Sequence, residues 1–461
     1  MSESRTPGER PHIILLATCD TKMEEITFVH NRLSTLNPDS RLTLIDIGRT
    51  AVSNPLITVS PDQLVRTTSS KPPPDMASQT RAAYSKTITS AATSYIHAQL
   101  GNPRTSSQTS GQDENDSRSH HPPVHGIIGI GGSTGSSIVA AVMRAAVPIG
   151  VPKLLVSTMA SGDVGHLVGG VDLTLMYSVV DIAGLNFLSE RVLGNAAAAM
   201  AGMARAYASS TTTTTGSSPS QADGAPRQQR KQRIALTMFG VTTPGADRIR
   251  ALLTRAPHGA EVVVFHATGA GGRAMEALVA AGEFDAVVDL TTTEVADEVG
   301  GGVLSAGPDR LAAAGAAGLP LVLSVGACDM VNFGPRPSVP AALAREAEAG
   351  RRTLHEHNAA VTLLRTSADE SRRVAAFMVE KLRASRRPDR VRVLLPTEGI
   401  SMISGKGGPF EDRAADEALF RGLEEGLEGS GIRVERHAVE INDPVFAEKV
   451  VEALVGLQSI S

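Results

Sequence analysis

Short, continuous apolar runs separated by helix-like stretches are the feature that most restricts the fold of this chain. The runs are HIILLATC, LTLIDIG, VHGIIGI and PKLLVST in the first half, and IALTMFG, EVVVFHAT, DAVVDLT, LPLVLSVGA and RVRVLLP in the second. Strands that are apolar at every position are typical of parallel sheets covered by helices on both faces. Because strands and helices alternate along the chain, we expect an α/β fold of two Rossmann-like subdomains with mainly parallel sheets and flanking helices.

The composition agrees with that architecture. The chain has 461 residues with no Trp, 4 Tyr and 10 Phe, so Val, Leu, Ile and Ala must fill the core. A formal net charge of -4 gives no overall basic surface for nucleic acid. Two cysteines exclude a disulfide framework and a thiol-rich metal site. No apolar stretch approaches the roughly 20 residues of a membrane span, and the run IILLA is too short for a signal peptide. We therefore expect a cytoplasmic protein that binds neither a membrane nor nucleic acid directly.

Two polar segments define the expected domain organisation. The segments at about 101–123 and 209–231 hold too few apolar residues to offset the entropy of ordering, and both read as disordered. A new strand signal, RIALTMFGV, follows the second segment at once. We expect an N-terminal nucleotide-binding subdomain at 11–208 that carries the first segment as an insertion, a low-complexity linker at 209–231, and a C-terminal α/β subdomain at 232–457.

A glycine-rich turn, GIGGSTGSS at 129–137, follows the third apolar run and precedes a helix-like stretch. Glycine lets a backbone approach a ligand closely, and a helix start offers N–H groups to an anion. The turn lacks the Lys of a P-loop, and Thr134 stands where the dinucleotide fingerprint has its third glycine. Asp46 precedes the turn, so it cannot be the acid that follows that fingerprint. The turn is either a site that binds an anion or a tight turn between strand and helix that binds no ligand.

Two more strand ends of the first half are expected at the same crevice, because ligands of open α/β sheets bind at the carboxyl ends of strands. One carries Asp20 and Lys22, and the other is STMASGD at 157–163. Hydroxyl and N–H groups suit phosphate oxygens, Lys22 would add charge, and Asp20 or Asp163 would reach sugar hydroxyls or Mg²⁺. Each Asp is equally typical of a helix cap or a turn, with Asp20 as the N-cap of the first helix.

Acidic side chains and a histidine follow strand signals in the second half. Glu294 and Asp297 share one face of a helix, His266 ends the run EVVVFH, and Asp329 follows GAC. These side chains together would act as an acid, a base or metal ligands at the carboxyl ends of the strands. Acids in a first helical turn are also favoured by the helix dipole alone, and His266 is equally typical of a structural histidine. Cys328 suits a small buried role better than that of a nucleophile, because no His lies near it in the sequence.

Together these segments resemble the UPF0261 family, whose best-known relative is the N-terminal domain of the tomato virus-resistance protein Tm-1. The resemblance covers about 11–457 apart from the two polar segments. It is carried by GIGGSTGSS, PKLLVSTMASGDV, VVDIAGLN, FGVTTP, FHATGAGGRAMEAL, DLTTTEVADEVGGG, GACDMVNFG, HNAAVTLLRTSADE and GISMISGKGGPFEDRAADEALF. It implies two α/β subdomains, a homodimer, and ATP binding in the first subdomain.

The resemblance also implies which residues of the first subdomain bind the nucleotide. They are Gly131, Gly132, Ser133, Thr134, Gly135, Ser136, Thr158, Met159, Ala160, Ser161 and Gly162. Thr134 stands where the family's loop usually has a glycine, and its larger side chain would narrow the space for a phosphate. Ser404 stands where the closing motif usually has an acid, which puts a metal role there in doubt. Longer relatives carry a C-terminal barrel domain, so a separate barrel-domain partner is expected.

Two functions remain open. One is a Tm-1-like nucleotide-binding protein that holds ATP, with or without Mg²⁺, and does not turn it over. The other is an ATP-dependent enzyme that acts on a small metabolite in a cleft of the second subdomain, with His266, Glu294, Asp297 and Asp329 as its catalytic residues. A dehydrogenase that uses NAD is disfavoured because the fingerprint is absent. The sequence does not decide whether the chain is an enzyme or which metal it uses.

Overall fold

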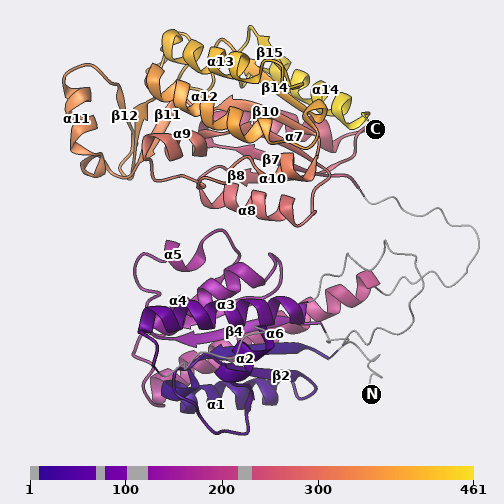
Figure 1. The fold of residues 1–461 in the computed structure, drawn as a ribbon, viewed down its shortest axis with the longest axis vertical. Helices are drawn as coiled ribbons and strands as arrows, with labels where there is room; N and C mark the ends of the chain where they lie inside the picture. The colour runs from indigo at the N-terminus through magenta and orange to yellow at the C-terminus, as the bar shows by residue number, and fades with distance from the viewer. Residues whose placement is uncertain (1–9, 69–77, 101–122, 216–230, 461) are drawn as a thin grey trace, which may run out of the picture. The chain divides into compact units, whose positions relative to one another are not determined.

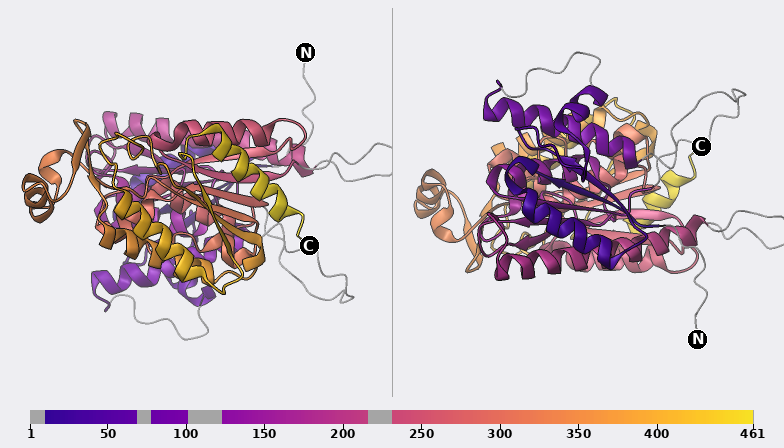
Figure 2. Two further views of the ribbon diagram at one scale, coloured as in Figure 1. Left: turned by 90° about the horizontal axis from the view of Figure 1, so that it is seen from above. Right: turned by 90° about the horizontal axis from the view of Figure 1, so that it is seen from below.

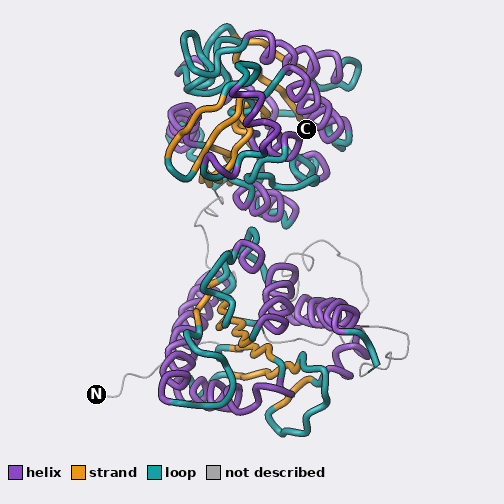
Figure 3. Tube along the Cα trace, turned by 90° about the vertical axis from the view of Figure 1, so that its left-hand side faces the viewer, coloured by secondary structure: helices purple, strands orange, loops and turns teal. Residues whose placement is uncertain are grey.

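The computed structural model describes residues 10–68, 78–100, 123–215 and 231–460 (Figure 1). The chain divides into two compact units, Met1–Ala225 and Pro226–Ser461. In each unit the strands lie between layers of helices (Figure 3). The insertion predicted at about 101–123 lies almost entirely outside the described residues, as does 216–230 of the predicted linker. Residues 209–215 of that linker are the end of a helix of the first unit.

The first unit has one sheet of six parallel strands in the order β3-β2-β1-β4-β5-β6. Its strands are β1 (His12–Ala17), β2 (Arg41–Asp46), β3 (Ile57–Val59), β4 (Gly126–Gly131), β5 (Lys153–Ser157) and β6 (Thr174–Tyr177). Its helices are α1 (Cys19–Leu36), α2 (Pro61–Thr68), α3 (Arg81–Leu100), α4 (Ser133–Ala146), α5 (Gly165–Val168) and α6 (Phe187–Thr215). This strand order is that of dinucleotide-binding Rossmann folds.

Alternate side chains of each strand enter two separate cores, as the pleat of a strand requires. In β1, Ile13 and Leu15 pack with α1 and α6, whereas Ile14 and Leu16 pack with α2, α3, α4 and α5. All six residues of β1 and of β4 are buried. The continuous apolar runs of the sequence are therefore strands covered on both faces, as predicted.

The second unit is built on a second sheet of six parallel strands, in the order β15-β14-β10-β9-β7-β8. Its strands are β7 (Arg233–Met238), β8 (Glu261–His266), β9 (Ala286–Thr291), β10 (Leu321–Gly326), β14 (Val391–Pro396) and β15 (Arg433–His437). Its helices are α7 (Thr243–Thr254), α8 (Ala270–Ala280), α9 (Thr293–Gly300), α10 (Ala313–Ala317), α12 (Ala368–Arg383), α13 (Arg413–Leu427) and α14 (Pro444–Gln458). If the six strands of this sheet alone are numbered in chain order, their order from the edge strand β8 is 2-1-3-4-5-6, as in flavodoxin-like sheets.

Helices α7 and α14 cover one face of this sheet, and α8, α9, α10, α12 and α13 cover the other. A small antiparallel sheet follows β10, with β11 (Met330–Phe333), β13 (Val361–Arg365) and β12 (Leu354–Asn358) in that order. Helix α11 (Ala341–Glu348) connects β11 to β12 and projects from one side of the unit (Figure 2). None of the strand signals in the sequence predicted this sheet.

The predicted fold class is confirmed, with several elements added. The apolar runs predicted nine strands of the two large sheets, and the structure adds β3, β6 and β15. The glycine-rich turn consequently follows the fourth strand of the first unit and not the third. No helix among the described residues is long and apolar enough to cross a membrane.

Candidate functional site

The carboxyl ends of β1 and β4 lie at the point where the strand order of the first sheet reverses. From β1 the chain adds β2 and β3 on one side, and from β4 it adds β5 and β6 on the other. The connections that leave β1 and β4 therefore diverge, and the crevice between them is where open α/β sheets bind ligands. The turn from β4 to α4 contains the glycine-rich residues singled out in the sequence.

Packing requires only one of the three predicted glycines of this turn. A Cβ on Gly131 would lie 2.4 Å from the backbone nitrogen of Ser136, a clash that nothing can relieve cheaply. A Cβ on Gly132 would meet nothing nearer than Thr158 Oγ1 at 4.0 Å, and one on Gly135 nothing nearer than Thr18 Cγ2 at 3.7 Å. Packing therefore requires glycine at neither position: Gly132 borders space beside Thr158, whereas Gly135 is buried and an added Cβ would make ordinary contact with Thr18.

The amino end of α4 is not capped by a side chain. Its N-cap residue is Gly132, and the first backbone bond of the helix runs from Ser136 N to Gly132 O. Within the part of the chain that the structure describes, the N–H groups of Ser133, Thr134 and Gly135 have no hydrogen-bond partner. Unpaired N–H groups at the positive end of a helix dipole favour an anion.

The structure places Ser136 behind the turn and not at its opening. Its side chain is fully buried, and its hydroxyl lies 3.0 Å from Gly131 O and 2.6 Å from Ser157 Oγ. Thr158 N donates to Gly131 O, and Met159 N donates to Ser157 Oγ. These bonds hold the ends of β4 and β5 together, so Ser136 supports the turn while Thr158 borders the open space beside Gly132.

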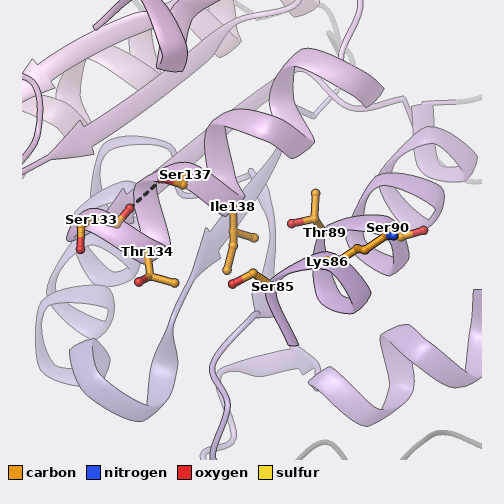
Figure 4. A pocket seen from close by; sticks show the side chains of 8 residues that line it. All are labelled: Ser85, Lys86, Thr89, Ser90, Ser133, Thr134, Ser137 and Ile138. Atoms are coloured by element: carbon orange, nitrogen blue, oxygen red, sulfur yellow. Dashed lines mark hydrogen bonds between the residues drawn. The ribbon is translucent and has the colours of Figure 1, made fainter. Parts of the chain in front are cut away.

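A pocket of about 610 Å³ lies beside the turn, between α3 and α4 (Figure 4). Hydroxyl groups and one lysine dominate its lining, which consists of Ser85, Lys86, Thr89, Ser90, Ser133, Thr134, Ser137 and Ile138. In Figure 4 the side chains of Thr134 and Ile138 face Ser85 across the space between the two helices. Thr134 is thus exposed into the pocket, whereas the Lys86 side chain extends away from the turn, toward Ser90 (Figure 4). The packing of α3 on α4 assembles this set, and no motif in the sequence indicated it.

Asp20 and Lys22 lie in the first turn of α1, where they hold neighbouring loops in place. The N-cap position of α1 is Thr18, so the prediction of Asp20 as N-cap is wrong by two positions. Asp20 Oδ2 instead accepts from the N–H groups of Arg49 and Thr50, after β2. Lys22 Nζ donates to Ile182 O at 2.5 Å and so ties the loop between β6 and α6 to α1.

The predicted residues after β5 form an open turn. Met159 is exposed to 43%, Ser161 and Gly162 are exposed, and Ala160 N donates to Ser157 O. Asp163 Oδ1 accepts from Gly165 N, which is the turn-forming role considered for it. Met159, Ala160, Ser161 and Gly162 are therefore available to a ligand on the β5 side of the crevice.

Asp46 ends β2 and lies next to this crevice, although the sequence analysis gave it no role. Its Oδ1 accepts from Cys19 N and Gly48 N, and its Oδ2 is buried without a hydrogen-bond partner. Burial raises the pKa of this carboxyl, and its two backbone hydrogen bonds act in the opposite direction. Burial likewise raises the pKa of the Cys19 thiol. Both side chains are enclosed by the fold, so neither reaches the opening.

In the second unit, Glu294 belongs to a buried ionic cluster. Arg310 is completely buried and donates to Glu294, to both oxygens of Asp289 and to Glu276. Glu294 Oε1 also accepts from Gly269 N and Gly272 N, at the start of α8. Burial raises the pKa of Glu276 against the attraction of Arg310. These groups fix α8, α9 and the loop around Arg310 to the end of β9.

Asp297 and Asp329 are buried as well, and each accepts hydrogen bonds from other residues of the second unit. Asp297 accepts from Leu304 N, Asn332 N and Asn332 Nδ2, and burial raises its pKa to about 6. Asp329 accepts from the hydroxyl of Ser401, and burial raises its pKa. Ser404, at the predicted departure from the family motif, accepts from Ile400 N and Ser401 N.

His266 is the exposed member of the predicted catalytic set, and its ring lies 5.6 Å from the ring of Phe239. Cys328 is buried, as the sequence favoured, and burial raises its pKa to about 12. The structure thus encloses three of the four predicted catalytic side chains and does not gather the four around an opening. Among the described residues no group of three His, Cys, Asp or Glu side chains could hold a metal ion.

Comparison with known proteins identifies relatives along both units. Residues 11–209 match the model of the uncharacterised protein family UPF0261, N-terminal domain, and residues 231–458 match that of its C-terminal domain. A UPF0261 protein of Clostridium tetani is 42% identical over 72% of this chain and 76% of its own length. A second, from Mesorhizobium japonicum, is 46% identical over 71% of this chain and 76% of its own length. The tomato ToMV resistance protein Tm-1(GCR237) is 42% identical over 72% of this chain, which corresponds to 41% of the tomato protein.

Proposed function

This chain belongs to the UPF0261 family, and from that premise we propose that it is a nucleotide-binding protein that holds ATP in its first unit. The phosphates lie at the amino end of α4, where the unpaired N–H groups of Ser133, Thr134 and Gly135 donate to their oxygens. The hydroxyl-lined pocket between α3 and α4, whose lining includes Lys86, continues this site.

One observation carries the proposal. Gly132 and Gly135 adopt no positive φ, and an added Cβ would clash at neither, so neither backbone conformation nor packing requires glycine there. Gly132 is the N-cap, where glycine is preferred over alanine, but Gly135 lies within the first turn of α4, where glycine weakens the helix relative to alanine. A ligand that approaches the backbone at the start of α4 explains the glycine at 135.

The remaining expectations stay predictions: Mg²⁺ beside the phosphates, a homodimer, a separate barrel-domain partner and a cytoplasmic location. The alternative of an ATP-dependent enzyme with its substrate in the second unit gains no support from the geometry. Glu294, Asp297 and Asp329 are buried and bonded within the unit, so a substrate would have no direct access to them.

The substitution Gly135→Ala tests the proposed function. The added methyl group makes only ordinary contact with Thr18, so the variant should fold as well as the wild type or better. Because the methyl group would lie between α4 and Thr18, next to the proposed phosphate position, we expect ATP binding to weaken about ten-fold or more in calorimetric titrations, a loss of about 1.4 kcal/mol.

The matched control is Gly202→Ala in α6, where an added Cβ meets nothing within 4 Å. This variant should gain similar helix stability and bind ATP as the wild type does. Equal ATP affinity in Gly135→Ala and the wild type would contradict the proposed site, and so would an absence of ATP binding by the wild type at millimolar concentration.

A further inference from the structure

Exposed apolar side chains of the first unit gather in one segment. Among its described residues, all the large hydrophobic side chains that are exposed lie between residues 159 and 187: Met159 at 43%, Tyr177 at 42%, Val179 at 56% and Phe187 at 73%. Single exposed apolar residues are ordinary on a protein surface. Phe187 begins α6, but Met159, Tyr177 and Val179 lie at or just after the ends of two neighbouring strands, and such a concentration is typical of a binding surface.

Strand register brings the ends of β5 and β6 side by side, and three of these residues lie at or just after those ends. Tyr177, the last residue of β6, pairs with Ser157, the last residue of β5, and Ser178 N extends the pairing by donating to Ser157 O. Met159 and Val179 each follow two residues later. Paired residues of parallel strands point to the same face. Since the Ser157 hydroxyl contacts Ser136 of α4, Tyr177 lies on the face of the sheet that α4 covers.

Val179 holds a backbone conformation that its side chain disfavours. Its φ is 65°, and Val180 N donates to Ser178 O across it at 2.7 Å, which makes Val179 the centre of a γ-turn with positive φ. Such turns are rare and strained, above all for a β-branched residue. The Ser178 hydroxyl secures the turn by donating to Val180 O. A strained residue whose side chain is more than half exposed gains little from packing, and such strain is typical of binding sites.

This surface continues from the proposed phosphate site. Thr158 bonds to Gly131 through its N–H group and borders the space beside Gly132, and Met159 follows it directly. Neighbouring strands lie about 4.8 Å apart, so the ends of β4 and β6 are separated by about 10 Å. An extended nucleoside triphosphate can span that distance with its phosphates at α4 and its base over β5 and β6.

We propose that Met159, Tyr177 and Val179 form the platform that holds the base of the bound nucleotide. This inference rests on the proposed function and adds to it the orientation of the ligand and a binding role for Tyr177 and Val179. The base stacks on the ring of Tyr177 and contacts the apolar side chains of Met159 and Val179. The platform supplies apolar contact, and the N–H groups at the start of α4 bind the phosphates.

Calorimetric titration of the full chain with ATP and with inorganic tripolyphosphate, which has no base, tests the platform. Loss of a stacking side chain typically weakens binding by about ten-fold. We expect Tyr177→Ala to weaken ATP binding by about that factor and to leave tripolyphosphate binding unchanged. Tyr177→Phe, which keeps the ring, should bind ATP as the wild type does.

Val179→Gly separates a binding role from a structural one. Glycine accepts the positive φ, so this variant should melt at the same temperature as the wild type or higher, yet bind ATP more weakly. Val445→Ala in the second unit, where Val445 is exposed to 50%, is the control and should change neither property.

The failures of the two proposals are distinguishable. If the wild type binds neither ATP nor tripolyphosphate, the proposed function is wrong, and the proposed platform is wrong as well. If the wild type binds both but Tyr177→Ala retains full ATP affinity, the platform alone is wrong and the phosphate site survives. A wild type that binds ATP no more tightly than tripolyphosphate would also overturn the platform.

Discussion

Single residues show where sequence reasoning works and where it stops. The sequence indicated that glycine matters at 131, 132 and 135, but only the structure separates Gly131, which packing requires, from Gly132 and Gly135, which it does not. Glu294 was correctly expected in a first helical turn. Its partner Arg310 comes 16 residues later and reaches it only through folding, so the buried cluster was not predictable.

Arg310 provides the prediction at this scale. Replacing it by Met would leave Asp289, Glu294 and Glu276 buried without their counter-charge. We expect a loss of about 3–5 kcal/mol in the free energy of unfolding of the second unit. Urea unfolding can be followed by the reactivity of Cys328, the single thiol of that unit.

Arg248→Met is the matched control, because Arg248 pairs with Glu448 at the surface. Its effect should stay below about 1 kcal/mol. Similar stabilities of the two variants would show that the buried cluster does not hold the unit together.

At the scale of elements, continuous apolar runs predicted the central strands well and the peripheral ones poorly. β1, β4, β9 and β10 are buried at every position, so apolar residues dominate their sequences, and only a few polar residues such as Asp289 and Ser324 are buried among them. β6 and β15 have no fully buried residue, and β12 contains His355, Glu356 and His357. Such strands are stabilised by their neighbours in the sheet and leave little apolar signal in the sequence. The pocket between α3 and α4 was missed for a related reason, since its two sides lie about fifty residues apart in the chain.

The tie between α9 and β11 gives a pH-dependent prediction. Asp297 joins these elements through Asn332, and burial raises its pKa in the folded chain from 3.8 to about 6. Between these values the folded state binds a proton that the unfolded state has lost, so stability must fall as pH rises. We expect this group to remove about 2–3 kcal/mol of stability between pH 4 and pH 6.

Denaturant unfolding at a series of pH values, followed by circular dichroism, measures this effect. Asp297→Asn removes the titrating group, so its stability should vary less with pH over the same interval. If the variant and the wild type show the same slope, Asp297 does not titrate with a raised pKa in the folded protein.

At the scale of the whole molecule, the two units carry separate reporters. All four tyrosines lie in the first unit, which makes intrinsic fluorescence specific to it. Each unit also contains one buried cysteine, Cys19 in the first and Cys328 in the second. Cys19 begins α1 directly after Thr18, which faces Gly135 of the proposed phosphate site. A ligand bound at α4 should therefore stabilise the first unit alone.

Thiol labelling with and without ATP tests this central claim most directly. Binding to the folded first unit lowers the population of its open form by the factor 1 + [ATP]/Kd, so ATP at a hundred times Kd should slow the labelling of Cys19 by about 100-fold. Cys328 should react at an unchanged rate, and Gly135→Ala should lose most of the protection of Cys19. Protection of Cys328 without protection of Cys19, or no effect of ATP on either thiol, would contradict the account.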